Sequence, residues 1–282
     1  MKEKAKKTSR RKFLRRGFLG ALGACAALGA YPFVEARFFV VTRRRIGVPG
    51  LPKAFAGTTV ALLTDIHHGP YYGMGHVRSI VEKANELGAD LIALGGDYVH
   101  RDAKYIEPCI AGLGKLKAKK GVFAVLGNHD HWESAPKTRA ALEKAGIPEF
   151  DSSGVWLEKH GERLRFCGVD DLWEGVTDLN AALADCGEDE AAILLTHNPD
   201  LAEGIRDRRV KLVLSGHTHG GQVDIPFMGP PFIPSRYGDK YAEGLVKTGH
   251  TQVYVSRGLG TISPPVRFNC RPEMALLTLE AI

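Results

Sequence analysis

The loop formed by residues 215–222 holds the densest group of possible metal ligands in the chain. It reads Ser-Gly-His-Thr-His-Gly-Gly-Gln, which places the imidazoles of His217 and His219 two residues apart. The apolar residues 210–214 precede it and predict a buried β-strand. Open α/β sheets bind ligands at the carboxyl ends of their strands, and glycines let a backbone come close to a ligand. We therefore expect a binding site at this strand end.

Four further apolar runs end in the same kinds of residue. The polar residues Asp65 and His67 follow the run 60–64, and Asp97 follows the run 91–94. Asn128, His129 and Asp130 follow the run 122–126, and His197 follows the run 193–195. Carboxylates, imidazoles and amides are common metal ligands. Five strand ends that carry such groups predict one convergent metal site.

The segments between these runs indicate the fold class. Apolar residues at helical spacing predict helices near residues 74–87 and 105–117, and Ser134-Ala135-Pro136 is typical of a helix start. The first half thus alternates strand and helix, which favours a parallel sheet. The later predicted elements are a hairpin of residues 155–157 and 164–166, a short helix at 179–184, and strands at 223–225, 252–256 and 275–279. Strands in both halves favour a two-sheet α/β sandwich with flanking helices.

Composition separates the N-terminus from the rest of the chain. The 282 residues carry a net charge of +6, but residues 1–16 hold nine Lys or Arg and one Glu, a charge of +8. The remainder has a charge of −2, which suits metal binding and argues against a nucleic-acid partner. The five cysteines lack metal-type spacing, so the last four are expected to be buried thiols, with one disulfide as the alternative.

Residues 1–36 are typical of a targeting segment. Residues 9–15, Ser-Arg-Arg-Lys-Phe-Leu-Arg, resemble the bacterial twin-arginine export signal, and the apolar residues 17–34 follow. This run is near the minimum length for crossing a bilayer. The basic residues before it favour an uncleaved membrane anchor, with the catalytic domain exported to the periplasmic or extracytoplasmic face.

Two alternatives remain for this segment, and a linker is expected after it. The basic tail could precede an ordinary buried helix, and residues 22–25 resemble a lipoprotein box that would place a lipid on Cys25. The sequence after Cys25 stays apolar, so an unmodified Cys25 is favoured. Residues 37–50 are predicted to be a juxtamembrane linker, whose arginines 43–45 either contact anionic lipid or are solvated. Residues 51–282 are predicted to form the catalytic domain.

The polar blocks together resemble those of the calcineurin-like metallophosphoesterases. They are Asp65-x-His67, Gly96-Asp97, Gly127-Asn128-His129-Asp130, His197 and Gly216-His217-x-His219, in the family's order. The resemblance implies a four-layer αββα sandwich of two mixed sheets, and two divalent metal ions. It implies that Asp97 bridges the two ions, that Asp65, His67 and His219 complete the first, and that Asn128, His197 and His217 complete the second. Such mixed nitrogen and oxygen ligands suit Mn²⁺, Fe or Zn²⁺.

The same resemblance implies a reaction. A hydroxide held between the metals would attack the phosphorus of a phosphate mono- or diester, because a metal can lower the pKa of its bound water to about 7. His129 is expected to protonate the leaving group or to hold the phosphate, and Asp130 to orient the imidazole of His129. The alternative for His129 is a spacer in a turn.

The substrate is less closely indicated. Residues 216–223, 256–261 and 265–273 resemble bacterial phosphoesterases with an N-terminal membrane or export segment, some of which hydrolyse UDP-2,3-diacylglucosamine, a lipid A precursor. The apolar residues 225–234 suit a lipid-like substrate or a stiff loop packed on the core. The predicted substrate contacts are His68, Arg236, Tyr237, Lys240 and Arg257, whereas His76, His100, His160 and His250 are expected at the surface.

Three functions follow from this reading. A general phosphoesterase at the membrane or cell envelope ranks first, because lipid A synthesis is cytoplasmic and the domain is expected to be exported. A UDP-2,3-diacylglucosamine hydrolase ranks second. A metal-holding module that binds the cell envelope is the non-enzymatic alternative, and the complete set of ligands together with His129 argues against it.

Overall fold

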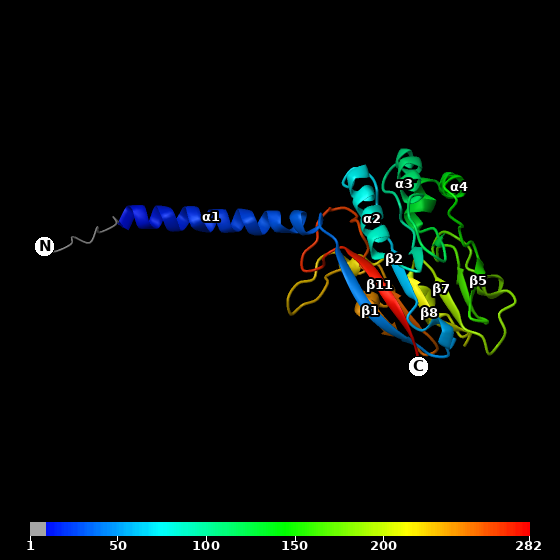
Figure 1. Cartoon of the computed structure of the whole chain (residues 1–282). Helices are drawn as coiled ribbons and strands as arrows, with labels where there is room; N and C mark the ends of the chain where they lie inside the picture. Colours follow the sequence, from blue (N-terminus) through cyan, green and yellow to red (C-terminus); the bar gives the residue numbers. More distant parts are fainter. Residues whose placement is uncertain (1–9) are drawn as a thin grey trace.

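The computed structural model describes residues 10–282, except for the side chains of residues 10, 11 and 21–28. Two β-sheets face each other, and helices cover the outer face of each (Figure 1). The predicted α/β architecture with two mixed sheets is confirmed.

The first sheet has five strands in the order β1-β11-β2-β3-β4. Their bounds are β1 Val40–Val48, β11 Glu273–Ala281, β2 Thr59–Leu63, β3 Leu91–Leu94 and β4 Val122–Ala124. Strands β2, β3 and β4 are parallel, as the alternation of strand and helix predicts, and β11 runs antiparallel to β2. The carboxyl ends of β2, β3 and β4 therefore lie at one edge.

The second sheet has six strands in the order β5-β6-β7-β8-β10-β9. Their bounds are β5 Ser153–Lys159, β6 Glu162–Gly168, β7 Ala192–Leu195, β8 Val210–Ser215, β10 Gln252–Val255 and β9 Gly244–Lys247. The predicted hairpin is β5 and β6. Strand β9 was not predicted, and residues 223–225 form only isolated bridges instead of the predicted strand.

The helices cover the sheets through their apolar faces. The α-helices after the first are α2 Met74–Leu87, α3 Ile106–Leu113, α4 Asn128–Lys144 and α5 Leu179–Leu183. The 3₁₀-helices are η1 Lys53–Phe55, η2 Ala103–Tyr105, η3 Pro199–Glu203, η4 His219–Gly221 and η5 Gly238–Tyr241. Helices α2, α3 and α4 pack on the first sheet, and α5 with η3 on the second. A third apolar cluster, which includes Leu62, Phe166 and Leu277, fills the space between the sheets.

Two helices differ from the predicted bounds. Helix α3 ends at Leu113 instead of near residue 117, next to Gly112 and Gly114, which are weak helix formers. Helix α4 begins at Asn128 and is interrupted by a non-helical Ser134, so the predicted start near residue 134 is that of its second part. The first part carries residues 128–130 and holds them at the edge of the sheet.

The predicted linker of residues 37–50 is wrong for most of its length. Strand β1 lies within it and pairs in parallel with β11 along all nine residues. Ile46 and Val48 are buried between the sheets, whereas Arg43 and Arg44 are exposed and Arg45 pairs with Glu280. The local sequence with its basic residues indicates a solvated linker, because the partner strand lies more than 200 residues away in the sequence and local patterns do not reveal it.

Helix α1, Arg10–Glu35, projects from the domain and is attached at its C-terminal end (Figure 1). The Glu35 carboxylate accepts hydrogen bonds from the backbone N–H groups of Asn269, at 3.1 Å, and Cys270, at 2.9 Å. The backbone N–H of Arg267 donates to the Pro32 carbonyl. The helix is therefore continuous with the folded domain.

Within the part of the chain that the structure describes, no helix is both long enough and apolar enough to cross a membrane. The predicted anchor includes residues 21–28, whose side chains, Cys25 among them, lie outside the described residues. Residues 1–9, with most of the predicted basic segment, also lie outside them. The other four cysteines are buried and form no disulfide, as the predicted buried thiols require.

Candidate metal centre

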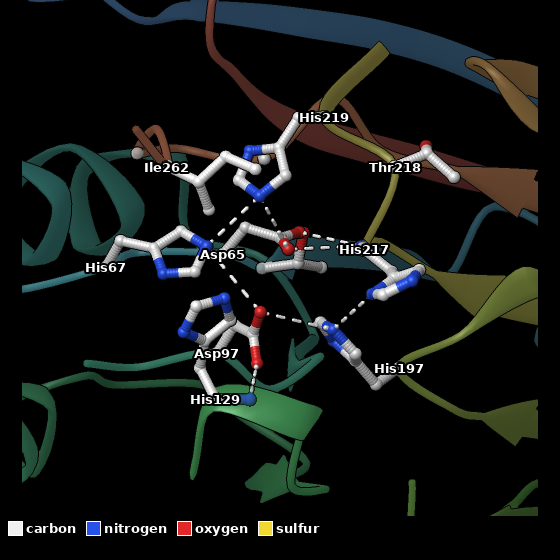
Figure 2. A network of polar contacts seen from close by, with 12 residues as sticks. Asp65, His67, Asp97, His129, His197, His217, Thr218, His219 and Ile262 are labelled. Carbon is white, nitrogen blue, oxygen red and sulfur yellow. Dashed lines mark hydrogen bonds and ion pairs between the residues drawn. The ribbon is translucent and has the colours of Figure 1, made fainter. Parts of the chain in front are cut away.

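Seven buried residues follow the ends of β2, β3, β4, β7 and β8, and Figure 2 shows the side chains of six of them, all but Asn128, facing one another. They are Asp65, His67, Asp97, Asn128, His197, His217 and His219, and none is more than 5% exposed. Parallel strands place their carboxyl ends at one edge, and the facing sheets bring two such edges together.

Asp97 stands between two groups of imidazoles. On one side the Nε2 atom of His67 lies 3.6 Å from Asp97 Oδ2 and 3.1 Å from Nε2 of His219, which is itself 3.4 Å from Asp65 Oδ1. On the other side Nε2 of His197 lies 3.3 Å from the same Oδ2 atom and 3.1 Å from Nδ1 of His217. The shared position of Asp97 between the groups is that of a bridging carboxylate.

The donor set fits a pair of divalent cations. Nitrogen atoms that face each other at 3.1 Å need a shared proton or a cation between them. Burial holds the pKa of His67 and His219 well below the usual value and lowers the pKa of His217 to about 3, so these rings are neutral and have free lone pairs. The Asn128 Oδ1 atom is buried without a hydrogen-bond partner in the described structure, and an amide oxygen is a suitable ligand for a divalent metal.

The carboxylates respond to the same surroundings in opposite ways. Burial raises the pKa of Asp65 to about 6. Burial acts in the same direction on Asp97, but the nearby His197 outweighs it and, with His129 and His67, holds the pKa of Asp97 well below its usual value. Burial opposes the charge on His197, yet Asp97 at 3.3 Å raises the pKa of that imidazole well above normal. A metal ion would take over the role of the proton in each of these contacts.

The backbone at this site is strained. Five of the seven residues have positive φ angles, namely Asp65 at 54°, His67 at 49°, Asp97 at 55°, His217 at 71° and His219 at 54°. Residues other than glycine adopt this left-handed conformation rarely, at a cost of order 1–3 kcal/mol each, and such residues cluster at functional sites. The fold therefore maintains an unfavourable backbone in order to aim these side chains inward.

Two glycines allow the strand ends to come this close. A Cβ atom added to Gly127 would overlap Asp97 and lie 2.8 Å from Nδ1 of His197. One added to Gly216 would overlap the Asp65 carboxylate. A larger residue at either position would displace a ligand, which explains why glycine occurs there.

Comparison with known proteins agrees with this geometry. A family model for calcineurin-like phosphoesterases matches residues 58–221. The chain is 35% identical to the uncharacterized metallophosphoesterase YkuE of Bacillus subtilis, over 98% of this chain and 99% of YkuE. The chain belongs to the calcineurin-like phosphoesterase family. The predicted metal-dependent phosphoesterase is thereby confirmed.

Two further similarities extend over most of the chain. Phosphodiesterase YaeI of Escherichia coli is 30% identical, over 96% of this chain and 99% of YaeI. The solved structure of TT1561 from Thermus thermophilus is 15% identical with a TM-score of 0.47, and the match covers 72% of this chain and 90% of that one.

In this phosphoesterase the structure gives Asp130 a different role from the predicted one. Its carboxylate accepts hydrogen bonds from the backbone N–H groups of Asp97 at 2.7 Å, Gly127 at 3.0 Å and Tyr98 at 3.0 Å, and within the described residues it forms no hydrogen bond with the imidazole of His129. Asp130 therefore positions the loop that carries Asp97. The motif alone does not reveal this, because the three donors belong to the backbone.

The neighbour of His129 is His100, which was expected at the surface. His100 is only 6% exposed, and its Nδ1 atom lies 3.4 Å from Nδ1 of His129. Burial lowers the pKa of His100 to about 4, so this ring is neutral. The backbone N–H of His129 donates to Asp97 Oδ1, and its ring packs edge-on against His67. His129 thus lies beside the ligands with a partly exposed ring. His76 is also not at the surface, since it is half-buried and bonded to the Leu259 carbonyl.

Three of the five predicted substrate contacts have other partners. His68 is buried, with Nδ1 2.7 Å from the Tyr72 carbonyl oxygen. Lys240 forms an ion pair with Glu203. Arg257 lies 3.0 Å from Glu273 and 2.9 Å from Glu243.

The other two predicted contacts, Arg236 and Tyr237, are exposed. The ring of Tyr237 packs on Tyr241. Lys240 and Arg257 were predicted to contact the substrate, but their positive charges are compensated by carboxylates of the protein itself.

Two tryptophans beside the site were missed from the sequence. Trp132 packs edge-on against His129, with ring centroids 4.6 Å apart, and Trp173 packs against His217 at 4.4 Å. Both indoles remain partly exposed, at 55% and 40%. Trp132 lies three residues after His129, which is the one sequence signal that could have indicated it.

Proposed function

We propose that this protein hydrolyses phosphodiesters at a centre of two divalent metal ions, Mn, Fe or Zn. The observation that carries this proposal is the single oxygen of Asp97 shared between two groups of imidazoles. One ion would be held by Asp65, His67, Asp97 and His219, and the other by Asp97, Asn128, His197 and His217. When bound, such ions polarise a phosphate and lower the pKa of a bound water.

The protein's own residues prepare this chemistry. The ligands are buried, so each interaction with a phosphate oxygen takes place where solvent screening is weak. Asp130 keeps Asp97 in its strained conformation through the backbone of residues 97 and 98. His129 is the partly exposed imidazole beside the ligands, and we assign it the proton transfer to the leaving oxygen. His100 contacts its Nδ1 atom, which leaves Nε2 of His129 available to the substrate.

A diester is favoured because apolar surface lies beside ligands of both proposed ions. Trp173 contacts His217, and Ile262 lines a cavity together with His219. A diester has two organic groups, and each could contact one of these surfaces. The similarity to YaeI, which is named a phosphodiesterase, supports the same choice.

Two other functions have less support. Hydrolysis of UDP-2,3-diacylglucosamine would require recognition of a charged nucleotide, but Lys240 and Arg257 are paired with carboxylates. A binding module without turnover would need neither the strained ligand backbone nor an imidazole placed like that of His129.

We also propose that the protein is exported by the twin-arginine route and stays attached to the membrane through residues 1–36. The support is the Arg-Arg motif at residues 10–11 and the apolar run after it. Replacing both arginines by lysine should leave the protein on the cytoplasmic side in cell fractionation. Unchanged export of that variant would contradict the proposal.

The catalytic proposal is tested with chromogenic esters. The full chain is depleted of metal with a chelator and then given Mn²⁺ or Zn²⁺. We expect turnover of bis(p-nitrophenyl) phosphate to return with about two metal equivalents and to exceed that of p-nitrophenyl phosphate. Turnover that is the same with and without metal, or absent with both substrates, would refute the proposal.

A further inference from the structure

A cavity of about 240 Å³ lies directly beside the candidate metal centre. Thr218 and His219 of the metal loop form one part of its wall, and Pro231, Phe232, Ile262 and Val266 supply apolar side chains. Figure 2 shows the side chain of Ile262 next to His219. A phosphate held by the metal ligands would therefore have one of its organic groups within reach of this cavity.

The walls of the cavity are fixed to the metal loop itself. A Cβ atom added to Gly221 would lie 2.7 Å from the Phe232 carbonyl oxygen, so residues 230–233 pack directly on that glycine. On the other side, the backbone N–H of Ile262 donates to Gln222 Oε1 at 2.8 Å. Residues 221 and 222 follow the ligand His219, so the cavity keeps a fixed position relative to the metal centre.

The loop that supplies Phe232 to the cavity wall is apolar and exposed. Phe227 is fully exposed, Met228 is 81% exposed and Phe232 is 66% exposed, all on the loop of residues 225–234. In Figure 1 this loop, drawn in gold, projects on the side of the domain from which α1 leaves. Three large apolar side chains on one exposed loop are unusual for a surface that contacts only water.

The chemical character of the cavity wall also favours an apolar substrate group. The described residues that line the cavity include no Lys, Arg, Asp or Glu, so its wall offers no cation to a second phosphate or a carboxylate. The substrate group that enters here would gain mainly from burial of apolar surface.

We propose that this cavity binds an aliphatic chain of the substrate, which makes the substrate class a phosphate ester of a lipid. The proposal rests on the proposed function, because the metal centre fixes where the phosphate lies. The cavity sets the specificity, and the exposed side chain of Phe232 lies where the chain would enter. The reaction itself is the hydrolysis proposed above.

Binding of alkyl phosphates tests the proposal without relying on turnover. Methyl phosphate, hexyl phosphate and uridine monophosphate are titrated by calorimetry into the metal-loaded full chain. Each buried methylene is expected to lower Kd up to about fourfold, so hexyl phosphate should bind at least about tenfold more tightly than methyl phosphate. Equal Kd values for the two alkyl phosphates, or tighter binding of the nucleotide than of hexyl phosphate, would overturn the proposal.

Substitutions in the cavity wall test whether the alkyl chain binds in this cavity. Phe232→Ser and Ile262→Ser should bring the ratio of the two alkyl Kd values below about threefold, and an unchanged circular dichroism spectrum with two bound metal equivalents is the check for an intact fold. Ile282→Ser is the control, because Ile282 is 76% exposed and follows the end of β11 remote from the α1 junction. An unchanged ratio in both cavity variants would count against this location.

Failure of the two proposals can be told apart. Hydrolysis of bis(p-nitrophenyl) phosphate without any dependence of Kd on chain length leaves the phosphoesterase and removes the lipid substrate. A clear dependence on chain length without turnover of any ester leaves the cavity and removes the catalytic proposal.

Discussion

The metal centre and the loops around it are built in contrasting ways. The metal side consists of seven buried residues at strand ends, most of them in strained backbone conformations. The loop side consists of residues 170–174, 225–241 and 257–267, where Phe227, Met228 and Phe232 are exposed and Lys240 and Arg257 pair with carboxylates of other segments. The chemistry of the metal side is contained in motifs of two to four residues, whereas that of the loop side depends on which distant segments meet. Mutations on the two sides should therefore have effects of very different size.

The largest effect is expected for Asp97→Asn. The substitution keeps the shape of the side chain but removes the charge shared by the two imidazole groups, so we expect the loss of at least one metal equivalent. The value of kcat/KM should fall by about a thousandfold or more, which corresponds to about 4 kcal/mol. Metal content by elemental analysis and turnover of bis(p-nitrophenyl) phosphate measure both effects.

A control separates this result from damage to the fold. Glu190→Gln removes a carboxylate that pairs with Arg163 on the surface and should leave metal content and turnover unchanged. Removing one partner of the buried Asp97–His197 pair should lower the melting temperature of metal-free Asp97→Asn, so both proteins are compared at a temperature at which circular dichroism shows them folded. Two retained metals with full turnover would show that Asp97 is not the bridge.

The next largest effect is expected for His129→Gln, which should retain both metals. Loss of a positioned general acid lowers kcat by roughly 10²- to 10⁴-fold. His100→Gln should also keep the metals but lower kcat less, by about tenfold, because we expect His100 to act through its contact with His129. An effect of His100→Gln as large as that of His129→Gln would mean that His100 contacts the substrate itself.

The different predictability of the two sides has a physical reason. Each strand-end motif contains its own carboxylate or imidazole, and the apolar run before it predicts the strand, so the ligand residues and the two-sheet fold could be inferred from local patterns. The partners of Lys240 and Arg257 could not, because Glu203 and Glu243 are brought to them only by folding. Strand β1 was missed for the same reason, since its partner β11 is the last strand of the chain.

A small effect is expected on the loop side. Lys240→Met removes a charge that is already paired with Glu203, so kcat/KM for bis(p-nitrophenyl) phosphate should stay within about twofold of the wild-type value. Steady-state kinetics measure it, with Arg236→Met as the matched variant of an exposed basic residue. A tenfold rise in KM for Lys240→Met alone would restore Lys240 as a substrate contact.

The smallest effect concerns a contact that joins the two sides. His131 on α4 lies 2.7 Å from Asp170 at the start of the loop that carries Trp173, and this hydrogen bond raises the pKa of His131 above its usual value of 6.5. Below pH 6.5 the imidazole is charged in both the folded and the unfolded chain, so the contact stabilises the fold fully. As the pH rises through the higher folded pKa, this stabilisation is lost.

The wild type should therefore melt at a higher temperature than His131→Gln at pH 6, by a few degrees at most, and the difference should shrink at pH 9. His160→Gln provides the control, because His160 is exposed in the turn between β5 and β6. A difference that is equal at both pH values would show that the charge on His131 does not hold the Trp173 loop against α4. The two sides would then be joined by packing alone, and the aromatic wall beside His217 would keep its position at every pH.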